Sequence, residues 1–437
     1  MQQLMAKLRK KVSSGELYKV NFKSTPVEYE MNQLKSVNAE EMEGWALRLI
    51  SNGKIGFSSS TSESQFEAMV DMAMAVAQFG QVALFDFPGQ INADQEDKLK
   101  LYDHLLSEKS IAEMIEIGNN IMNRVNSINA ELRCDAGIVK QEGKIQYWNT
   151  YGASFTYQKT IFSNSIMIQD TQENDMMILM ESKQWGQANF SLDSLWEEVK
   201  KKIEWSKEIV EVENGYMPVI FTPKALLVLL LPLMAGLNGR MINRKISPLQ
   251  GKEGQLLFSP LLSMDSDGII DYAEGSAPYD DEGIAMQKLP LIEKGILKNY
   301  YYDLQNAAEA GVKPSGNGLR YSFHTSPSPG ISNLIVSEGN TSFTDMIKDI
   351  KTGIIVDQVL GLGQGNILSG AFSNNVQLGY KIVNGKIVGR IKNVMIAGNA
   401  LEVLKDIIAI GNKAEWISGR YYFPPIYIKS ISVSTKD

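Results

Sequence analysis

The chain has 437 residues, 44% hydrophobic and 21% charged, a composition typical of a globular protein with two or three domains. Its formal net charge of -7 comes without a large basic block, so the composition does not favour a nucleic-acid-binding surface. A single cysteine, Cys134, excludes an intramolecular disulfide and a cysteine-based zinc site, and it fits a reducing cytoplasm.

Two segments bear on targeting. The first residues, MQQLMAKLRKKV, carry charges with no apolar stretch behind them, so we expect no signal peptide. The most hydrophobic run is 225–237, which is interrupted by Pro232 and is shorter than the roughly 20 residues that a membrane-spanning helix needs. We therefore predict that this run is a buried core helix and that the protein is cytoplasmic, with no membrane partner.

Helix and hairpin signals alternate in the first half of the chain. The Asn52-Gly53 pair between two strand-like runs predicts a β-hairpin over 44–60. Capping boxes predict helices that open at Ser62, Ser110 and Ser194, with Gln65, Glu113 and Glu197 as their third residues. Together with apolar spacing at the start, the expected helices are 1–12, 62–79, 111–127 and 196–210. A strand-rich stretch is expected over 130–185, with turns at 142–144 and 173–175.

The sequence changes character near Glu213-Asn214-Gly215. Short strands separated by Gly, Pro and Asn turns follow, and Thr222 with Pro223 favours the start of a helix. The helices expected in this half are 223–238, 302–311, 342–351 and 400–410. We predict an α+β protein, in which an N-terminal α/β-type region with helices on mixed sheets precedes a C-terminal domain dominated by antiparallel β-sheet around a buried core helix. The expected domains are 1–105, 106–213 and 214–437.

An acidic segment is the main candidate site. DYAEGSAPYDDEG, residues 271–283, packs five carboxylates into thirteen residues, and close carboxylates need solvent, cations or N–H donors. It is either an acidic surface loop or a site for a basic group or an N-terminal amine. The substrate-binding residues that we predict are Asp271, Glu274, Asp280, Asp281, Glu282, Arg320 and His324.

Metal-ligand patterns are weak. The two histidines, His104 and His324, are far apart, and neither has a helical partner histidine. The segment 263–274 resembles a calcium loop, but Ser263 occupies the first ligand position and Pro260 interrupts the entry side, so we do not predict calcium binding. We predict no metal bound by this chain.

The same acidic segment carries a family resemblance. In order come DYAEGSAPYDDEG, then KGILKNYYYDLQNAAEAGVKPSGNGLR, then LSGAFSNNVQLGYKIVNGKIVGRIKNVMIAGNALEVLKDI. These motifs resemble the C-terminal part of PmbA/TldE proteins of the TldD/PmbA family. The resemblance is strong over 213–437 and weaker upstream, where the turn Asn149–Gly152 fits.

The resemblance implies a two-component protease, in which TldD-type and TldE-type chains pair. In the TldD type, a core helix carries H-E-x-x-x-H, and its histidines, with a later cysteine, hold a metal. The corresponding helix here is the apolar run, and Leu230, Leu231 and Ala235 stand where His, Glu and His are found. The resemblance therefore implies a PmbA/TldE-type chain without zinc ligands, which pairs with a zinc-bearing TldD-like chain and acts on unfolded peptides.

Two alternatives stay open. The chain could be a stand-alone homo-oligomer, for instance a homodimer, that binds peptides or acts as a scaffold. It could also be an enzyme of another class that uses the acidic segment with Arg320 and His324.

Overall fold

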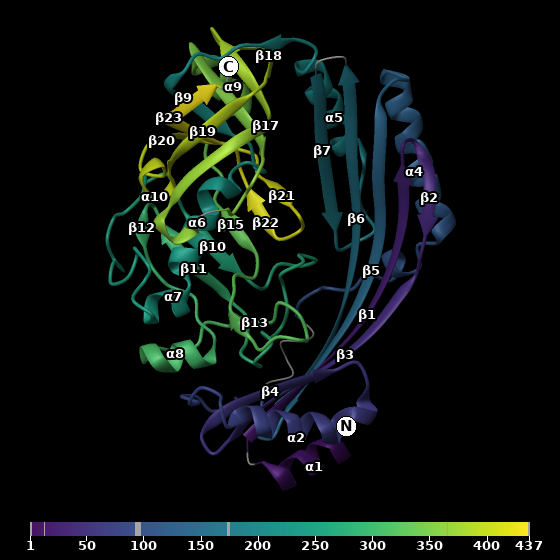
Figure 1. The fold of residues 1–437 in the computed structure, drawn as a ribbon, viewed down its shortest axis with the longest axis vertical. Helices are drawn as coiled ribbons and strands as arrows, with labels where there is room; N and C mark the ends of the chain where they lie inside the picture. The colour runs from purple at the N-terminus through teal and green to yellow at the C-terminus, as the bar shows by residue number, and fades with distance from the viewer. Residues whose placement is uncertain (1, 13, 92–97, 173–174, 365, 436–437) are drawn as a thin grey trace.

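A long sheet and a β-rich C-terminal half lie side by side in this computed structural model (Figure 1). The structure describes residues 2–12, 14–91, 98–172, 175–364 and 366–435. The N-terminal helices lie at the lower end of the long sheet in that view, and the C-terminus lies at the far end of the other half. Both strands and helices are well represented, so the α+β prediction is confirmed.

The long sheet has seven antiparallel strands, in the order β4-β3-β1-β5-β6-β7, with β2 paired to β1. Its strands are β1 (Ser14–Glu30), β2 (Gln33–Val37), β3 (Glu40–Ser51), β4 (Lys54–Ser60), β5 (Arg133–Asn149), β6 (Ser154–Gln172) and β7 (Asp175–Trp185). The predicted hairpin is confirmed as β3 and β4, and Asn52 and Gly53 adopt the positive φ angles of 50° and 74° that its tight turn requires.

One face of this sheet is covered by helices. The other face is covered at one end by the C-terminal half, where Tyr147 and Phe155 pack with Tyr279 and Phe323, and it is open farther along β5, β6 and β7. Alternate residues of β5, β6 and β7, such as Ile138, Ile166 and Leu179, are buried in one core with helices α4 (Ile111–Ile128) and α5 (Asp193–Trp205). At the end of the sheet, α1 (Gln2–Lys11) and α2 (Phe66–Ala77) form a separate core with β1 and β3. Short elements complete this half: the single 3-10 turn η1 (Glu63–Gln65) and α3 (His104–Ser107).

The C-terminal half is built on a closed barrel. Its strands pair in the order β16-β9-β23-β19-β17, and β17 also pairs with β16, which closes the ring. These strands are β9 (Gly215–Phe221), β16 (Thr352–Val359), β17 (Ala371–Val383), β19 (Val394–Asn399) and β23 (Ile426–Thr435). Attached to them are β8 (Ile209–Val210), β18 (Lys386–Ile391) and β20 (Ile407–Ile410).

A second, six-stranded sheet and short helices complete this half. The sheet contains β10 (Met264–Asp267), β11 (Lys288–Glu293), β12 (Ile296–Leu297), β15 (Leu334–Val336), β21 (Glu415–Ile417) and β22 (Tyr421–Phe423). A two-stranded ribbon is formed by β13 (Gly318–Leu319) and β14 (Ser328–Pro329). The helices are α6 (Leu227–Leu237), α7 (Gly239–Asn243), α8 (Leu304–Ala310), α9 (Phe343–Asp349), α10 (Ala400–Val403) and the 3-10 turn η3 (Ile367–Ser369).

The apolar run becomes α6, a core helix, as the sequence predicts. Leu229, Leu230 and Leu233 are fully buried among barrel strands and the second sheet, and Pro232 lies inside the helix. Among the residues that the structure describes, no helix is both long enough and apolar enough to cross a membrane.

Several local expectations are wrong for physical reasons. Only the Ser110 capping box forms, because Ser62 caps a 3-10 turn instead and Ser194 lies inside α5. Thr222 donates its hydroxyl to the Asp357 carbonyl instead of capping α6, which begins at Leu227.

Strand pairing overrides two further expectations. The expected turn at 142–144 is part of β5, because both neighbouring strands pair with it there. Residues 407–410 form β20 against β23 instead of extending α10. The expected turn at 173–175 falls partly outside the described residues.

Truncating the core helix tests its burial. Leu230→Ala should lower the free energy of unfolding by about 2–5 kcal/mol, because the side chain is fully buried and its loss leaves a cavity. Chemical denaturation followed by tryptophan fluorescence measures the change. Leu105→Ala, at a side chain 71% exposed, is the matched control and should change stability by about 0.5 kcal/mol or less. Equal losses in both variants would contradict a buried α6.

Candidate functional site

The acidic segment is folded into the protein at its second half. Asp280 and Glu282 have exposed fractions of 1% and 0%. The Asp280 carboxylate accepts backbone N–H hydrogen bonds from Glu282, Ile284 and Gly318 at 3.0, 2.9 and 2.8 Å. The surface-loop interpretation is therefore wrong for this part, because these bonds fold the segment and tie it to β13.

Glu282 belongs to a buried group of charges that joins the two halves of the molecule. Arg48 of β3 contacts Glu282 at 2.6 Å and Glu16 of β1 at 2.8 Å, and Arg320 contacts Glu16 at 2.7 Å. The Tyr147 hydroxyl of β5 lies 3.0 Å from Glu16 Oε2 and 3.1 Å from the Glu282 carbonyl. We name these five residues the Arg48 cluster. Its two arginines balance its two glutamates.

The surroundings of the Arg48 cluster are apolar. The Arg48 guanidinium lies 5.0 Å and 5.1 Å from the ring centroids of Phe85 and Phe87, a cation–π arrangement. Burial raises the pKa of Glu282 to about 7, although Arg48 opposes this shift. The Leu304 N–H donates to the second Glu282 oxygen at 2.7 Å. The Arg48 cluster thus holds the two halves together through ion pairs that are removed from water, and we call this contact the lock.

The other predicted site residues have separate surroundings. Asp281 accepts a hydrogen bond from the Arg320 backbone N–H at 2.7 Å, whereas the exposed Asp271 accepts one from Lys100 N at 2.9 Å. Glu274 accepts one from Gln184 at 2.6 Å. These residues therefore do not converge on one group, and their role in substrate binding stays a prediction.

His324 lies apart from the acidic segment. Its ring is exposed, packs on Phe323 with centroids 3.7 Å apart, and lies 3.1 Å from the Ser59 hydroxyl of β4. The Arg320 side chain is only 2% exposed and is committed to Glu16. In these interactions the His324 and Arg320 side chains have different partners, Ser59 and Glu16, so they do not form one reactive pair.

A second buried group of charges ties β7 to the barrel. Lys202 of α5 contacts Glu181 of β7 and Asp357 of β16, each at 2.7 Å, and Lys224 contacts Glu181 at 2.6 Å. We name these four residues the Lys202 cluster. Burial lowers the pKa of Lys224, and it also opposes ionisation of Asp357, yet the two lysines hold the Asp357 pKa below its ordinary value.

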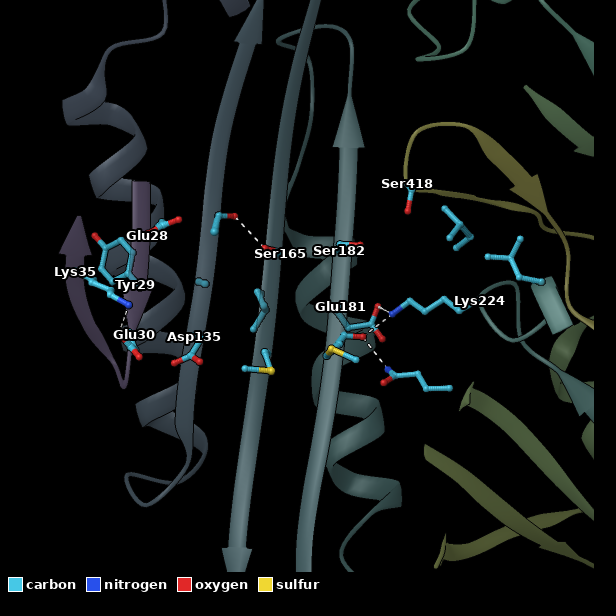
Figure 2. Close-up of a pocket in the computed structure, with 18 residues that line it drawn as sticks. Glu28, Tyr29, Glu30, Lys35, Asp135, Ser165, Glu181, Ser182, Lys224 and Ser418 are labelled. Atoms are coloured by element: carbon cyan, nitrogen blue, oxygen red, sulfur yellow. Dashed lines mark hydrogen bonds and ion pairs between the residues drawn. The ribbon is translucent and has the colours of Figure 1, made fainter. Parts of the chain in front are cut away.

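The Lys202 cluster borders a cavity of about 690 Å³, which we name the sheet trough. It lies on the open face of the long sheet and runs from Glu28 and Lys35 at one side to Lys224 and Ser418 at the other (Figure 2). Its lining residues are Glu28, Tyr29, Glu30, Lys35, Asp135, Ala136, Gly137, Ser165, Ile166, Met167, Met180, Glu181, Ser182, Lys224, Leu227, Gln358, Ile417 and Ser418. The volume lies in the range of small-molecule and peptide sites.

The positions that the resemblance aligns with a zinc motif lie on α6. Leu230 is fully buried, and Leu231 and Ala235 are half-buried. None of these side chains has a lone pair or an acid–base group, so this part of α6 does not fit a zinc ion. Within the described part of the chain, no group of three or more His, Cys, Asp or Glu side chains is placed to hold a metal ion.

Sequence reasoning missed most members of both charge clusters. Glu16 and Arg48 are directly opposite each other on β1 and β3, yet the sequence alone gives no register for that pairing. The only available signal was a charged residue inside an apolar strand-like run, as with Arg48 in GWALRLI. Lys202 belongs to the run Lys200–Lys202, and nothing in that run marks one lysine as buried, yet the Lys202 side chain is only 7% exposed.

Comparison with known proteins places this architecture in a family. A model described as the PmbA/TldA metallopeptidase C-terminal domain matches residues 214–435, and one described as PmbA/TldA metallopeptidase domain 1 matches residues 15–77. An uncharacterized protein of Methanocaldococcus jannaschii is 28% identical over 390 residues, which is 88% of each chain. A metalloprotease TldD homolog of Haemophilus influenzae is 36% identical over 207 residues, 47% of this chain and 43% of that protein.

The fold also matches a solved structure. The crystal structure of TldE from Thermococcus kodakarensis aligns with a TM-score of 0.91 over 99% of both chains, at 19% identity. At that identity, the match shows a shared fold.

Breaking the Arg48 cluster should be costly. Arg48→Met leaves the buried Glu282 carboxylate without its cation, so we expect the free energy of unfolding to fall by about 3–5 kcal/mol. Thermal and chemical denaturation measure the loss. Arg124→Met, at a partly exposed pair with Asp193, is the matched control and should cost about 1 kcal/mol or less. A similar small loss for both would contradict a desolvated lock.

The same cluster should make stability depend on pH. The Glu282 pKa is about 7 in the folded protein against an ordinary 4.5, so the folded state binds more protons between these values. The contribution of Glu282 to stability is therefore present at about pH 4.5 and is lost as pH rises towards about 7. Glu282→Gln removes this titration.

Denaturation over a pH series measures the difference. The unfolding free energy of the wild type minus that of Glu282→Gln should decrease as pH rises through this window. Glu116→Gln, at an exposed position on α4, controls for the loss of one surface carboxylate. A difference that stays constant with pH would contradict the shifted pKa.

Proposed function

This chain belongs to the PmbA/TldD metallopeptidase family, and from that premise we propose that it is the non-catalytic, TldE-like subunit of a two-component peptidase. In this proposal it pairs with a zinc-bearing TldD-like chain in the cytoplasm. It completes the chamber around the metal of that chain and restricts entry to unfolded peptides. The reaction chemistry then belongs to the partner.

The chemistry of α6 is the observation that carries this proposal. A zinc peptidase needs ligands and a general base at its metal helix. Leu230 is fully buried here and contributes to the main core, so the helix serves packing. The histidines give no substitute, because His104 opens α3 and His324 lies beside Ser59.

The surroundings of α6 support a role in handling peptides. The sheet trough reaches Leu227, the first residue of α6, and crosses the long sheet from β1 to β7. β7 is an edge strand of the long sheet, and at Met180 its carbonyl accepts hydrogen bonds from the Lys224 and Gln358 side chains instead of from a further strand. An extended peptide beside such an edge is recognised through its main chain, which suits unfolded substrates of varied sequence.

A stand-alone homo-oligomer, such as a homodimer, is the second candidate. Apolar side chains after α2 favour it, because Phe79, Val82 and Leu84 are 91%, 58% and 50% exposed. Native mass spectrometry of the purified chain separates the two candidates, since the second requires a stable assembly without any partner.

Reconstitution tests the proposal. We expect the purified chain to lack peptidase activity and to co-purify with the TldD-like protein of its own organism. A chelator-sensitive peptidase activity on unfolded peptides should appear in the mixture. Fluorogenic peptide cleavage and elemental analysis of each chain measure these outcomes.

Two results would contradict the proposal. One is stoichiometric zinc together with peptidase activity in this chain alone. The other is failure to bind the TldD-like protein under conditions where both chains are folded. A Leu231→Glu variant that binds the partner normally but gains no activity alone serves as a control for the inert helix.

A further inference from the structure

We propose that the sheet trough binds an extended peptide segment that carries a basic side chain, and that this chain itself selects such peptides. The choice of a peptide as the occupant rests on the proposed function. The charge preference rests on the trough alone and is tested on the isolated chain.

Small side chains form the floor of the trough. Gly137 of β5 pairs with Ser165 of β6, and Ser165 pairs with Ser182 of β7, so the three positions lie in one row across the sheet. In antiparallel strands, directly paired residues point to the same face. Their neighbours Glu181 and Ile166 point to the helix-covered face. Because side chains alternate along a strand, the row of Gly137, Ser165 and Ser182 points to the open face, and its small side chains create the hollow.

Carboxylates dominate one end of the trough. Glu28 and Glu30 of β1 and Asp135 of β5 line it, and among the described residues that line this end only Lys35 is basic, paired with Glu30. At the other end Glu181 is already neutralised by two lysines of the Lys202 cluster. The uncompensated charge is therefore negative and confined to the Glu28 end, which favours a basic group.

An unpaired acceptor lies at the other end. Gln358 is 8% exposed, and its amide nitrogen donates to the Met180 carbonyl at 2.8 Å. Its buried Oε1 atom has no hydrogen-bond partner among the described residues. A buried acceptor without a donor is unfavourable. The Oε1 atom is itself shielded from solvent, so a main-chain N–H of a bound peptide can donate to it once the Gln358 amide turns towards the trough.

The remaining lining suits a chain with aliphatic parts. Met167 and Met180 lie in the next row of the floor, where they pair directly, and Leu227 and Ile417 line the wall on the barrel side. Methionine side chains adapt to ligands of varied shape. Such a surface can cover the stem of a lysine or arginine while the charge reaches the carboxylates.

Binding of matched peptides to the isolated chain tests the proposal. Three short, unstructured, dye-labelled peptides differ only at a central Lys, Gln or Glu. By fluorescence anisotropy at low salt, we expect the Lys peptide to bind about five-fold more tightly than the Gln peptide, and the Glu peptide to bind most weakly. The preference should shrink at high salt.

Variants locate the binding to the trough. The double variant Glu28→Gln with Asp135→Asn should abolish the preference for Lys, while its amide oxygens can still accept the hydrogen bonds that now come from Ser36 and Met31. Ser182→Trp should fill the floor and weaken all three peptides. Glu40→Gln, at an exposed residue of β3 outside the trough, should change nothing. Circular dichroism verifies folding of each variant.

Three results would overturn the proposal. They are equal affinity for the three peptides, an unchanged Lys preference in the folded double variant, and spermidine binding as tightly as the Lys peptide. The last would make a polyamine the occupant. These binding measurements use the isolated chain, without partner or zinc. Their result therefore does not depend on whether reconstitution with a TldD-like chain succeeds, and the two proposals can fail separately.

Discussion

Pairing of buried charges between the two halves is the constraint on which the rest of the structure depends. Arg48, held between Glu16 and Glu282, is almost completely removed from water. A buried charge is tolerated only when its partner stays beside it. If the turn at Glu282 moved away from β1 and β3, Arg48 would lose the Glu282 carboxylate and part of a buried charge would be left uncompensated. The Lys202 cluster imposes the same condition between β7 and the barrel. Two separate pairings fix the angle between the halves better than one, because a single contact leaves a hinge.

This fixed arrangement explains why the trough is preformed. Its floor comes from the long sheet and its wall from Lys224, Leu227 and Ser418 of the other half. Neither half encloses the space alone. The Lys224 ammonium bonds both the Glu181 carboxylate and the Met180 carbonyl, so the contact that holds the halves together also caps one point of the β7 edge. In our proposal, structural and binding roles therefore meet in the same few side chains, and the trough is already formed without a ligand.

Local signals in the sequence predicted local structure well. The Asn52-Gly53 hairpin, the Ser110 capping box and the apolar helix α6 all formed, because each depends on neighbouring residues. Predictions failed where distant residues compete. The expected turn at 142–144 is a strand because β1 and β6 pair on both sides of it. Likewise, the acidic segment looked solvated, and only the arrangement of β3 against the segment's turn brings Arg48 to Glu282.

The same reasoning separates what the family shares from what this chain does. The motif Asp280–Glu282 that carries the resemblance serves the lock between the halves, since its oxygens are used by Arg48 and by backbone N–H groups. In this chain the motif therefore has a structural task that involves no metal. Residues 230, 231 and 235 have no such structural requirement for polar groups, and in this chain they are apolar. Family membership is shown by the family models that match residues 15–77 and 214–435, whereas our proposal of a division of labour between two chains rests on α6. The trough lies where the two halves meet, with Leu227 of α6 in its wall, and in our proposal it is where this chain influences which peptides are accepted.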